Sequence, residues 1–468
     1  MARRMQSAVM KGSRLKIPLI FAADVIHGHR TIFPVPVAEA ASFEPSLAER
    51  TARVAAYEAA AAGIDWTFFP MVDIARDQRW GRTMEGAGED VLVGNLFAAA
   101  RVRGFQGPGP DGERCDDGLR QAFRRLWRGG VGAGLQRGRP VRADAARRLS
   151  AALQGRLRCG PVLRDEWKFP GIIVSDYTGD EEMIAAGFAK DGRDAARIAF
   201  LAGVDMCMQS NLYMQHLPGL VRDGLVPQEV LDRSVRRVLV VKHRLGLFDD
   251  PFRRIDVKRE KARSRTKASL ALAREAGRKS IVLLKNDGDL LPLPKAGRRL
   301  ALIGPFASGQ HDLNGPWVVY GDNKQAVDLA TGLRAAMADP SLLSVTAGSG
   351  VEEALPGGID AAVAAATAAD IVLLAIGESE SMSGEAQSRT EIVVPAPQQA
   401  LAEAVAATGK PVVVILKNGT WPGAARRGAR RARDPDDLVP GLGKRPCHRR
   451  RAVRRLFPLG APADQPAL

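Results

Sequence analysis

The sequence predicts an α/β protein with two consecutive domains, and three observations carry this prediction. Short apolar segments rich in Val, Ile and Leu alternate along most of the chain with Ala-rich segments of helical length, which is typical of parallel sheets covered by helices. Several of the apolar segments end near an acidic residue, as strands do at the functional rim of a (β/α) barrel. A charged stretch without periodicity, residues 249–267, separates the two domains and is interpreted as a linker.

The first domain, residues 1–248, is expected to be a TIM-like barrel of parallel strands. Its candidate strands are residues 17–23, 66–74, 171–175 and 203–208, and its candidate helices include residues 45–62 and 194–201. Three of the strands end near Asp24, Asp73 and Asp176. The barrel interpretation places these acids at the functional rim, whereas the alternative makes them N-caps at strand-to-helix turns.

The second domain, residues 268–422, is expected to be a doubly wound α/β sheet that begins with a helix over residues 268–280. Candidate strands follow at residues 281–285, 300–303, 371–376 and 412–416, with candidate helices at residues 360–369 and 398–407. The periodic pattern stops after Asn418. The tail, residues 423–468, contains no segment that is expected to complete the sheet.

Length and hydropathy bound the class of protein. A chain of 468 residues is long enough for two or three domains with sizeable cores. No segment approaches an uninterrupted membrane span. The early apolar run, residues 17–23, ends at Asp24 and predicts a strand rather than the core of a signal peptide. We therefore expect neither a membrane segment nor an export signal in this sequence.

Two Arg-rich blocks account for the formal net charge of +16. Residues 112–158 carry +8 and residues 424–455 carry +9, which leaves the rest of the chain at −1. Both blocks are almost free of Lys and lack periodicity, whereas basic nucleic-acid-binding arms usually mix Lys with Arg and often interleave aromatic residues. Out-of-frame translation of a GC-rich gene would give this composition, and we favour that interpretation over an RNA-binding insert. No nucleic-acid partner is expected.

Cysteines and short motifs propose no further kind of site. Cys115, Cys159, Cys207 and Cys447 have no metal-like spacing and are interpreted as free thiols. The glycines form neither a dinucleotide fingerprint nor a P-loop, and no pair of histidines at helical spacing suggests a metal site. A Gly-x-Ser-x-Gly nucleophile elbow is also missing from the sequence. Neither a metal nor an organic cofactor is expected.

Two carboxylates occur in settings that suit catalysis. Asp176 follows an apolar run and is expected at the C-terminal end of a buried strand, whereas Glu385 lies in a Gly/Ser-rich loop after the strand at residues 371–376. Two carboxylates from separate elements that converge on one cleft are what glycoside hydrolysis requires. Spacing alone leaves the alternatives open, with Asp176 as a helix N-cap or turn residue and Glu385 as a solvated side chain.

Longer motifs decide between these alternatives. They are Asp24-Val25-Ile26-His27-Gly28, Arg76-Asp77-Gln78-Arg79-Trp80-Gly81-Arg82-Thr83-Met84-Glu85-Gly86-Ala87-Gly88-Glu89-Asp90, Ile173-Val174-Ser175-Asp176-Tyr177 and Ser383-Gly384-Glu385-Ala386-Gln387-Ser388-Arg389-Thr390. With these motifs the chain resembles the β-glucosidases of glycoside hydrolase family 3, of the bacterial periplasmic type. The resemblance covers roughly residues 17–105 and 161–420.

The resemblance implies an incomplete TIM-like barrel followed by a doubly wound α/β sandwich, with the active site between them. It implies a retaining exo-acting β-glycosidase in which Asp176 is the nucleophile and Glu385 the acid/base, with no cofactor. Asp24, Arg82 and Tyr177 are expected to bind the sugar. The expected partner is a small-molecule β-glucoside or oligosaccharide, and the oligomeric state is left open. The family also suggests a periplasmic or secreted location.

The sequence departs from the family pattern in three places. The family has a Lys-His pair, which binds sugar hydroxyls, between the positions matching Arg82 and Asp176, but here there is no Lys from residue 17 to 167 and no His from 30 to 215. Losing two hydrogen bonds of this kind would cost roughly 3–6 kcal/mol of transition-state binding. The tail after Gly423 does not match the sandwich, and the chain begins close to Asp24. An inactive remnant of such an enzyme is one alternative function, and a β-xylosidase of the same family is another.

Overall fold

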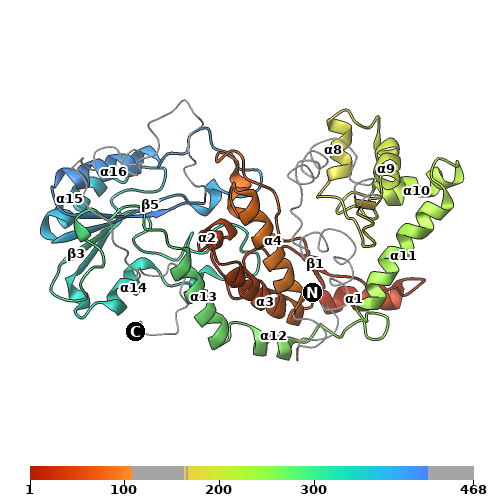
Figure 1. Cartoon of the computed structure of the whole chain (residues 1–468), viewed down its shortest axis with the longest axis horizontal. Helices are drawn as coiled ribbons and strands as arrows, with labels where there is room; N and C mark the ends of the chain where they lie inside the picture. The colour runs from red at the N-terminus through yellow and green to blue at the C-terminus, as the bar shows by residue number, and fades with distance from the viewer. Residues whose placement is uncertain (108–162, 165–166, 420–468) are drawn as a thin grey trace. The chain divides into compact units, whose positions relative to one another are not determined.

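The computed structural model describes residues 1–107, 163–164 and 167–419, so both Arg-rich blocks and the expectations for the tail lie outside the described residues (Figure 1). Contacts between Cα atoms divide the chain into two compact units. Unit 1 comprises residues 1–23, 56–68 and 102–263, and unit 2 comprises residues 24–55, 69–101 and 264–468. Two helices, α3 (Pro45–Ala61) and α4 (Val91–Gln106), contribute residues to both units.

Unit 2 contains a parallel four-stranded sheet in the order β4-β3-β5-β6. The strands are β3 (Leu300–Ile303), β4 (Leu343–Thr346), β5 (Ile371–Gly377) and β6 (Val412–Lys417). In register, Leu300 pairs with both Leu343 and Ile371, and Val372 pairs with Val412. Because β3 is central, the chain winds outward from it in both directions, as the doubly wound prediction requires.

Helices cover both faces of this sheet, with α15 (Gly358–Ala368) and α16 (Ala396–Ala407) on one face and α14 (Leu329–Ala336) on the other (Figure 1). Each face of the sheet carries its own hydrophobic cluster, and successive side chains of β5 contribute alternately to one cluster and to the other. Leu374 packs with α15 and α16, whereas Leu373 packs with α14. All seven residues of β5 are buried, which explains why this strand is a continuous apolar run in the sequence.

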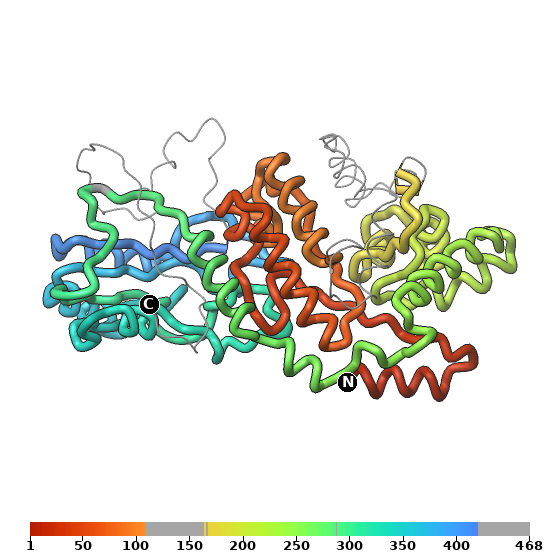
Figure 2. The backbone as a smooth tube through the Cα atoms, turned by 60° about the horizontal axis from the view of Figure 1, so that its bottom comes forward, coloured from red at the N-terminus to blue at the C-terminus, as the bar shows by residue number. Residues whose placement is uncertain are grey.

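Unit 2 also joins segments that are far apart in the sequence. The helix α13 (Lys267–Ser280) packs Ala273 and Ala276 against Phe33 and Leu47, which precede it by more than two hundred residues. Figure 2 shows the course of the backbone through these segments, coloured by residue number. The Thr266 hydroxyl accepts a hydrogen bond from the Ser269 amide and so caps the N-terminus of α13. The shorter elements of unit 2 are α2 (Pro36–Ala40), η1 (Gly81–Glu85), η3 (Asp287–Asp289), η4 (Asn323–Gln325), η5 (Pro340–Leu342) and η6 (Glu380–Met382).

Unit 1 is mainly helical in its described part. Its helices are α1 (Ala2–Gly12), α8 (Gly179–Ala185), α9 (Gly192–Leu201), α10 (Leu212–Arg222), α11 (Gln228–Arg244) and α12 (Val257–Arg263). The parallel strands β1 (Ala22–Ala23) and β2 (Trp66–Thr67) form a small sheet. A buried ion pair between Arg254 and Asp65, 2.9 Å long, holds the chain after α11 against the start of β2. No helix in the described part of the chain is long and apolar enough to cross a membrane.

Some of the helices and strands expected from the sequence are confirmed by the structure, and others differ from it. The helix expected at residues 45–62 and the strands expected at 300–303, 371–376 and 412–416 are confirmed to within one residue. The strand expected at residues 281–285 is wrong, because this segment has no strand partner among the described residues and exposes Val282 and Leu284. Part of the linker, residues 257–263, is helical. The expected strands at 17–23 and 66–74 shorten to β1 and β2.

Candidate functional site

Asp176 lies at the end of a segment that pairs with residues 205–208 in unit 1. Val174 forms a parallel bridge with Met206, and the Ser175 amide donates to the Met206 carbonyl at 2.9 Å. The Ser175 hydroxyl in turn accepts a hydrogen bond from the Met208 amide at 3.0 Å. The expected strands at 171–175 and 203–208 are therefore neighbours, although their regular pairing is limited to this bridge.

The helix that follows Asp176 does not use it as an N-cap. The helix α8 begins at Gly179, and its N-cap is Thr178. The Asp176 carboxylate instead accepts a hydrogen bond from the amide of Tyr177 at 2.7 Å. Both Asp176 and Tyr177 expose their side chains. This geometry argues against the N-cap alternative and leaves the carboxylate accessible to a ligand.

A buried carboxylate next to this segment fixes its position. Asp205 accepts hydrogen bonds from Arg164 at 2.5 Å, from the Ile173 amide at 2.9 Å and from Arg237 at 2.7 Å. Two guanidinium groups therefore compensate one buried charge, and burial lowers the pKa of Arg164 despite the nearby Asp205. This network holds the backbone at Ile173, three residues before Asp176.

Glu385 and Arg82 form an ion pair within unit 2. Arg82 Nη1 lies 3.0 Å from Glu385 Oε1, and the Glu385 side chain is half exposed. Arg82 belongs to the short helix η1, and Glu385 belongs to the loop that follows η6. The two residues are more than three hundred positions apart in the sequence, so the fold alone brings them together.

Backbone hydrogen bonds fasten the Glu385 loop to the segment that carries Arg82. The Gly81 amide donates to Gln387 O at 3.0 Å, the Gly384 amide donates to Gly81 O at 2.8 Å, and the Arg389 amide donates to Arg79 O at 3.0 Å. An antiparallel bridge between Trp80 and Ser388 completes this short ladder. Residues 79–82 and 384–389 therefore form one structural element, called here the two-segment ladder.

Gly81 makes the close approach of the two segments possible. A Cβ atom at this position would lie 2.5 Å from the carbonyl oxygens of both Gly384 and Gln387, which are backbone atoms that cannot rotate away. We expect Gly81→Ala to open the two-segment ladder and to cost about 1–3 kcal/mol, the usual penalty of overpacking. Hydrogen exchange measured by mass spectrometry should then show faster exchange over residues 384–389.

The matched control for Gly81→Ala is Gly332→Ala in α14. A Cβ atom there would meet only the Val327 side chain at 4.0 Å, and the backbone is helical. This substitution should leave exchange over residues 384–389 unchanged. Unchanged exchange in Gly81→Ala as well would contradict the steric argument.

Asp24 follows β1 and belongs to unit 2, where it is half buried. Burial and the nearby Asp24 carboxylate together raise the pKa of Tyr320. His27 connects the same segment to the region of Tyr320, because its two ring nitrogens lie 2.8 Å from the carbonyl oxygens of Phe33 and Pro316. Burial lowers the pKa of His27. The Asp24 segment is therefore fixed next to the loop that carries Pro316 and Tyr320.

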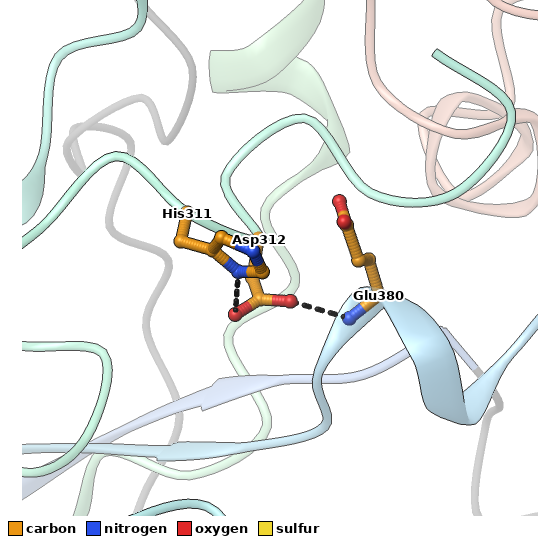
Figure 3. A group of neighbouring side chains, drawn as sticks. All are labelled: His311, Asp312 and Glu380. Atoms are coloured by element: carbon orange, nitrogen blue, oxygen red, sulfur yellow. Dashed lines mark hydrogen bonds and ion pairs between the residues drawn. The ribbon is translucent and has the colours of Figure 1, made fainter. Parts of the chain in front are cut away.

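One group of side chains in the described part of the chain has the composition of a metal site. His311, Asp312 and Glu380 place their potential ligand atoms within 4.8 Å of one another (Figure 3). The Asp312 carboxylate already bonds His311 Nδ1 at 2.9 Å and the Glu380 amide at 2.7 Å. The Lys417 ammonium donates to the Asp312 carbonyl, and burial lowers its pKa to about 8 although Asp312 and Glu380 oppose this shift. Since a cation already lies here and the His311 ring is exposed, we interpret the group as an anchor for the loop leading to Glu385.

The structure brings some of the expected site residues together and separates others by unit. Arg82 and Glu385 are in contact in unit 2, which also contains Asp24. Asp176 and Tyr177 belong to unit 1, so the ion pair does not include them. Glu85, which contacts Arg82, and Trp317, which contacts Glu85, are not among the expected site residues. Glu85 lies inside the motif around Arg82, whereas Trp317 carries no signal in the sequence.

Comparisons with known proteins match nearly the whole described chain to one family. The N-terminal domain of glycosyl hydrolase family 3 matches residues 1–111 and 156–241, and the C-terminal domain of the same family matches residues 281–422. These matches confirm the predicted fold class, a TIM-like barrel domain followed by an α/β sandwich domain.

Individual relatives extend this similarity. The chain is 38% identical to a periplasmic beta-glucosidase of Salmonella typhimurium over 89% of its own length and 60% of the relative. It is 29% identical to a beta-xylosidase of Formosa agariphila over 87% of its own length and 63% of that relative. The crystal structure of a beta-glucosidase from Listeria innocua superposes with a TM-score of 0.78 at 34% identity, covering 90% of this chain and 61% of that one. The chain thus spans about three fifths of the length of these relatives.

Proposed function

The chain belongs to glycosyl hydrolase family 3, and on this premise we propose that it is a retaining, exo-acting β-glucosidase that releases terminal glucose from β-glucosides. The observation that carries the proposal is the contact between Arg82 and Glu385, which joins one motif from each domain of the family. Support also comes from a Listeria innocua enzyme of similar structure, which has been crystallised with glucose and, as a mutant, with laminaribiose.

In the proposed first step, the Asp176 carboxylate attacks the anomeric carbon of the terminal glucose. The bond from this carbon to the glycosidic oxygen breaks, and Glu385 donates a proton to the departing oxygen. Glu385 becomes an anion in this step, and Arg82 Nη1, at 3.0 Å in the structure, supplies a positive charge that stabilises it. The product of the step is a covalent glycosyl ester of Asp176.

In the proposed second step, Glu385 removes a proton from a water molecule. The water attacks the anomeric carbon from the face that the aglycone left, and the Asp176 ester bond breaks. Two inversions give a product with the original β configuration. Asp24, Arg82 and Tyr177 bind the glycosyl unit in this proposal, because carboxylate and guanidinium groups form strong hydrogen bonds with hydroxyls and an exposed tyrosine offers a ring face.

A panel of nitrophenyl glycosides tests the substrate class. We expect the purified chain to hydrolyse the β-glucoside with a higher kcat/KM than the β-xyloside or the β-N-acetylglucosaminide, because the relatives with the higher sequence identities include beta-glucosidases. Preferred turnover of the acetamido sugar would contradict the proposal. A higher kcat/KM for the xyloside would favour the second candidate, a β-xylosidase, which the similarity to the Formosa agariphila enzyme supports.

The same panel tests the third candidate, an inactive remnant. The specific observation behind it is the lack of Lys from residue 17 to 167 and of His from 30 to 215, where the family has its sugar-binding pair. Turnover by a cooperatively folded chain that disappears in an Asp176 variant would exclude the remnant. We also propose the division into domains at residues 248 and 268, and the family matches that end at residue 241 and resume at residue 281 support it.

A further inference from the structure

The Arg82 guanidinium is held along one edge by a second carboxylate, that of Glu85. Arg82 Nε lies 3.0 Å from Glu85 Oε1 and 3.2 Å from Oε2, and Arg82 Nη2 lies 2.9 Å from Oε2. The Glu85 side chain is only 1% exposed, whereas that of Glu385 is 50% exposed. The two carboxylates that contact Arg82 therefore differ in exposure: Glu85 is buried, whereas Glu385 is accessible to solvent.

A third side chain fixes Glu85 itself. The Trp317 indole nitrogen donates to Glu85 Oε1 at 2.8 Å. Trp317 has a φ of +66°, a left-handed backbone conformation that is strained for a bulky residue and persists only where the surroundings hold it. Glu85 thus receives hydrogen bonds from two segments that are far apart in the sequence, and this fixes the plane of its carboxylate.

We propose that Glu85 is a positioning residue for the glycosidase reaction, which holds Arg82 so that its Nη1 edge faces Glu385 and the sugar. A carboxylate that contacts a guanidinium through two parallel hydrogen bonds fixes both its direction and its plane. Without this partner, the long Arg82 side chain would sample other rotamers, and its contact with the acid/base would weaken. The inference rests on the proposed function, because it assigns Glu85 a role in that reaction.

Charge balance gives Glu85 a second effect on the site. Arg82 carries one positive charge between two carboxylates, and Asp73 lies close enough for both Arg82 and Glu85 to influence it. Burial raises the pKa of Asp73, and Glu85 adds to this effect while Arg82 opposes it. Glu85 therefore compensates part of the charge of Arg82 as well as fixing its orientation.

The variant Glu85→Gln tests the proposal, and the chain contains a matched control. Glu39 forms a buried ion pair of the same kind with Arg101, 2.8 Å long, in the same unit. Glu39→Gln thus removes a comparable buried charge without touching Arg82. Both variants should lose thermal stability, since each replaces the buried carboxylate of an ion pair by a neutral amide.

Kinetics should separate the two variants. We expect Glu85→Gln to lower kcat/KM for nitrophenyl β-glucoside about 10- to 100-fold through both a higher KM and a lower kcat. Trp317→Phe should change kcat/KM in the same direction by a smaller factor. Glu39→Gln should keep the wild-type kinetic constants, measured below its melting temperature.

Crystal structures of the variants give a readout that does not depend on activity. In Glu85→Gln the distance from Arg82 Nη1 to Glu385 Oε1 should exceed hydrogen-bond length, whereas in Glu39→Gln it should remain near 3.0 Å. A retained contact in Glu85→Gln, or equal kinetic losses in the two variants, would overturn the positioning role. If the wild-type chain has no glycosidase activity, the proposed function fails, and the crystallographic distance still decides whether Glu85 positions Arg82.

Discussion

Replacing Asp176 by Ala should abolish the hydrolysis of β-glucosides. The substitution removes the carboxylate proposed to form the covalent intermediate, and no other described side chain is proposed to take its place. We expect kcat to fall by about 10⁴-fold or more, which corresponds to roughly 5.4 kcal/mol of activation free energy. The measurement is steady-state hydrolysis of a nitrophenyl β-glucoside by the folded variant.

Azide identifies the reason for this loss. In Asp176→Ala, azide can enter the space of the missing carboxylate and attack the anomeric carbon, which gives the α-glycosyl azide by a single inversion. The control is Glu181→Ala, which removes an exposed carboxylate five residues later in the first turn of α8 and should leave turnover nearly unchanged. Substantial residual hydrolysis without azide in Asp176→Ala would remove Asp176 from the role of nucleophile.

Replacing Glu385 by Ala should separate substrates by their leaving groups. General acid catalysis contributes typically about 10²–10⁴-fold, and a poor leaving group such as an alcohol or a sugar needs the proton most. We therefore expect a loss of this size for cellobiose or an alkyl glucoside, and a much smaller loss in glycosylation for nitrophenyl glucosides. Comparing kcat/KM for the two kinds of substrate gives the answer.

Azide again supplies a diagnostic product, because it can attack the glycosyl ester of Asp176 without a general base. The product in Glu385→Ala should be the β-glycosyl azide, of the opposite configuration to that expected with Asp176→Ala. Glu391→Ala is the control, since Glu391 is an exposed carboxylate six residues later. Equal losses for good and poor leaving groups, with no azide product, would exclude Glu385 as the acid/base.

The sheet of unit 2 was predictable because each of its buried strands carries its own signal. β5 is apolar at every position since both faces are covered, and the Ala-rich helices on either side have a clear period. β4 was missed because it is short, and only Leu343 in it is buried. The segment at residues 281–285 carries the same apolar signal as a strand but has no neighbour to pair with among the described residues. Strand pairing depends on the rest of the fold and cannot be recognised in the sequence of one segment.

The sequence predicted those residues of the candidate site whose type and position in a motif already suggest a chemical role. Asp176 follows an apolar run and Glu385 lies in a Gly/Ser-rich loop after a predicted strand, and the family motifs assign them roles. Glu85 is one of several acids in its motif, and only the bidentate contact with Arg82 distinguishes it. Trp317 contributes through its indole nitrogen in a strained loop, and neither the strain nor the contact is encoded in a local pattern.

The two-segment ladder has a consequence for recombining domains between relatives. Its cross-links join main-chain atoms, and its residue requirements include glycine at position 81, where a Cβ atom would not fit, and at position 384, where φ is +116°. Sequence drift at the other positions of residues 79–82 and 384–389 should therefore leave these backbone hydrogen bonds intact. A C-terminal domain from another member of the family that keeps the second glycine should then form the same ladder with this N-terminal segment. Conversely, a fragment that starts at residue 268 would contain Glu385 but lack Arg79, Gly81 and Arg82. Chimaeric enzymes should thus tolerate a seam at the linker, whereas the isolated C-terminal half should lose the order of its Glu385 loop.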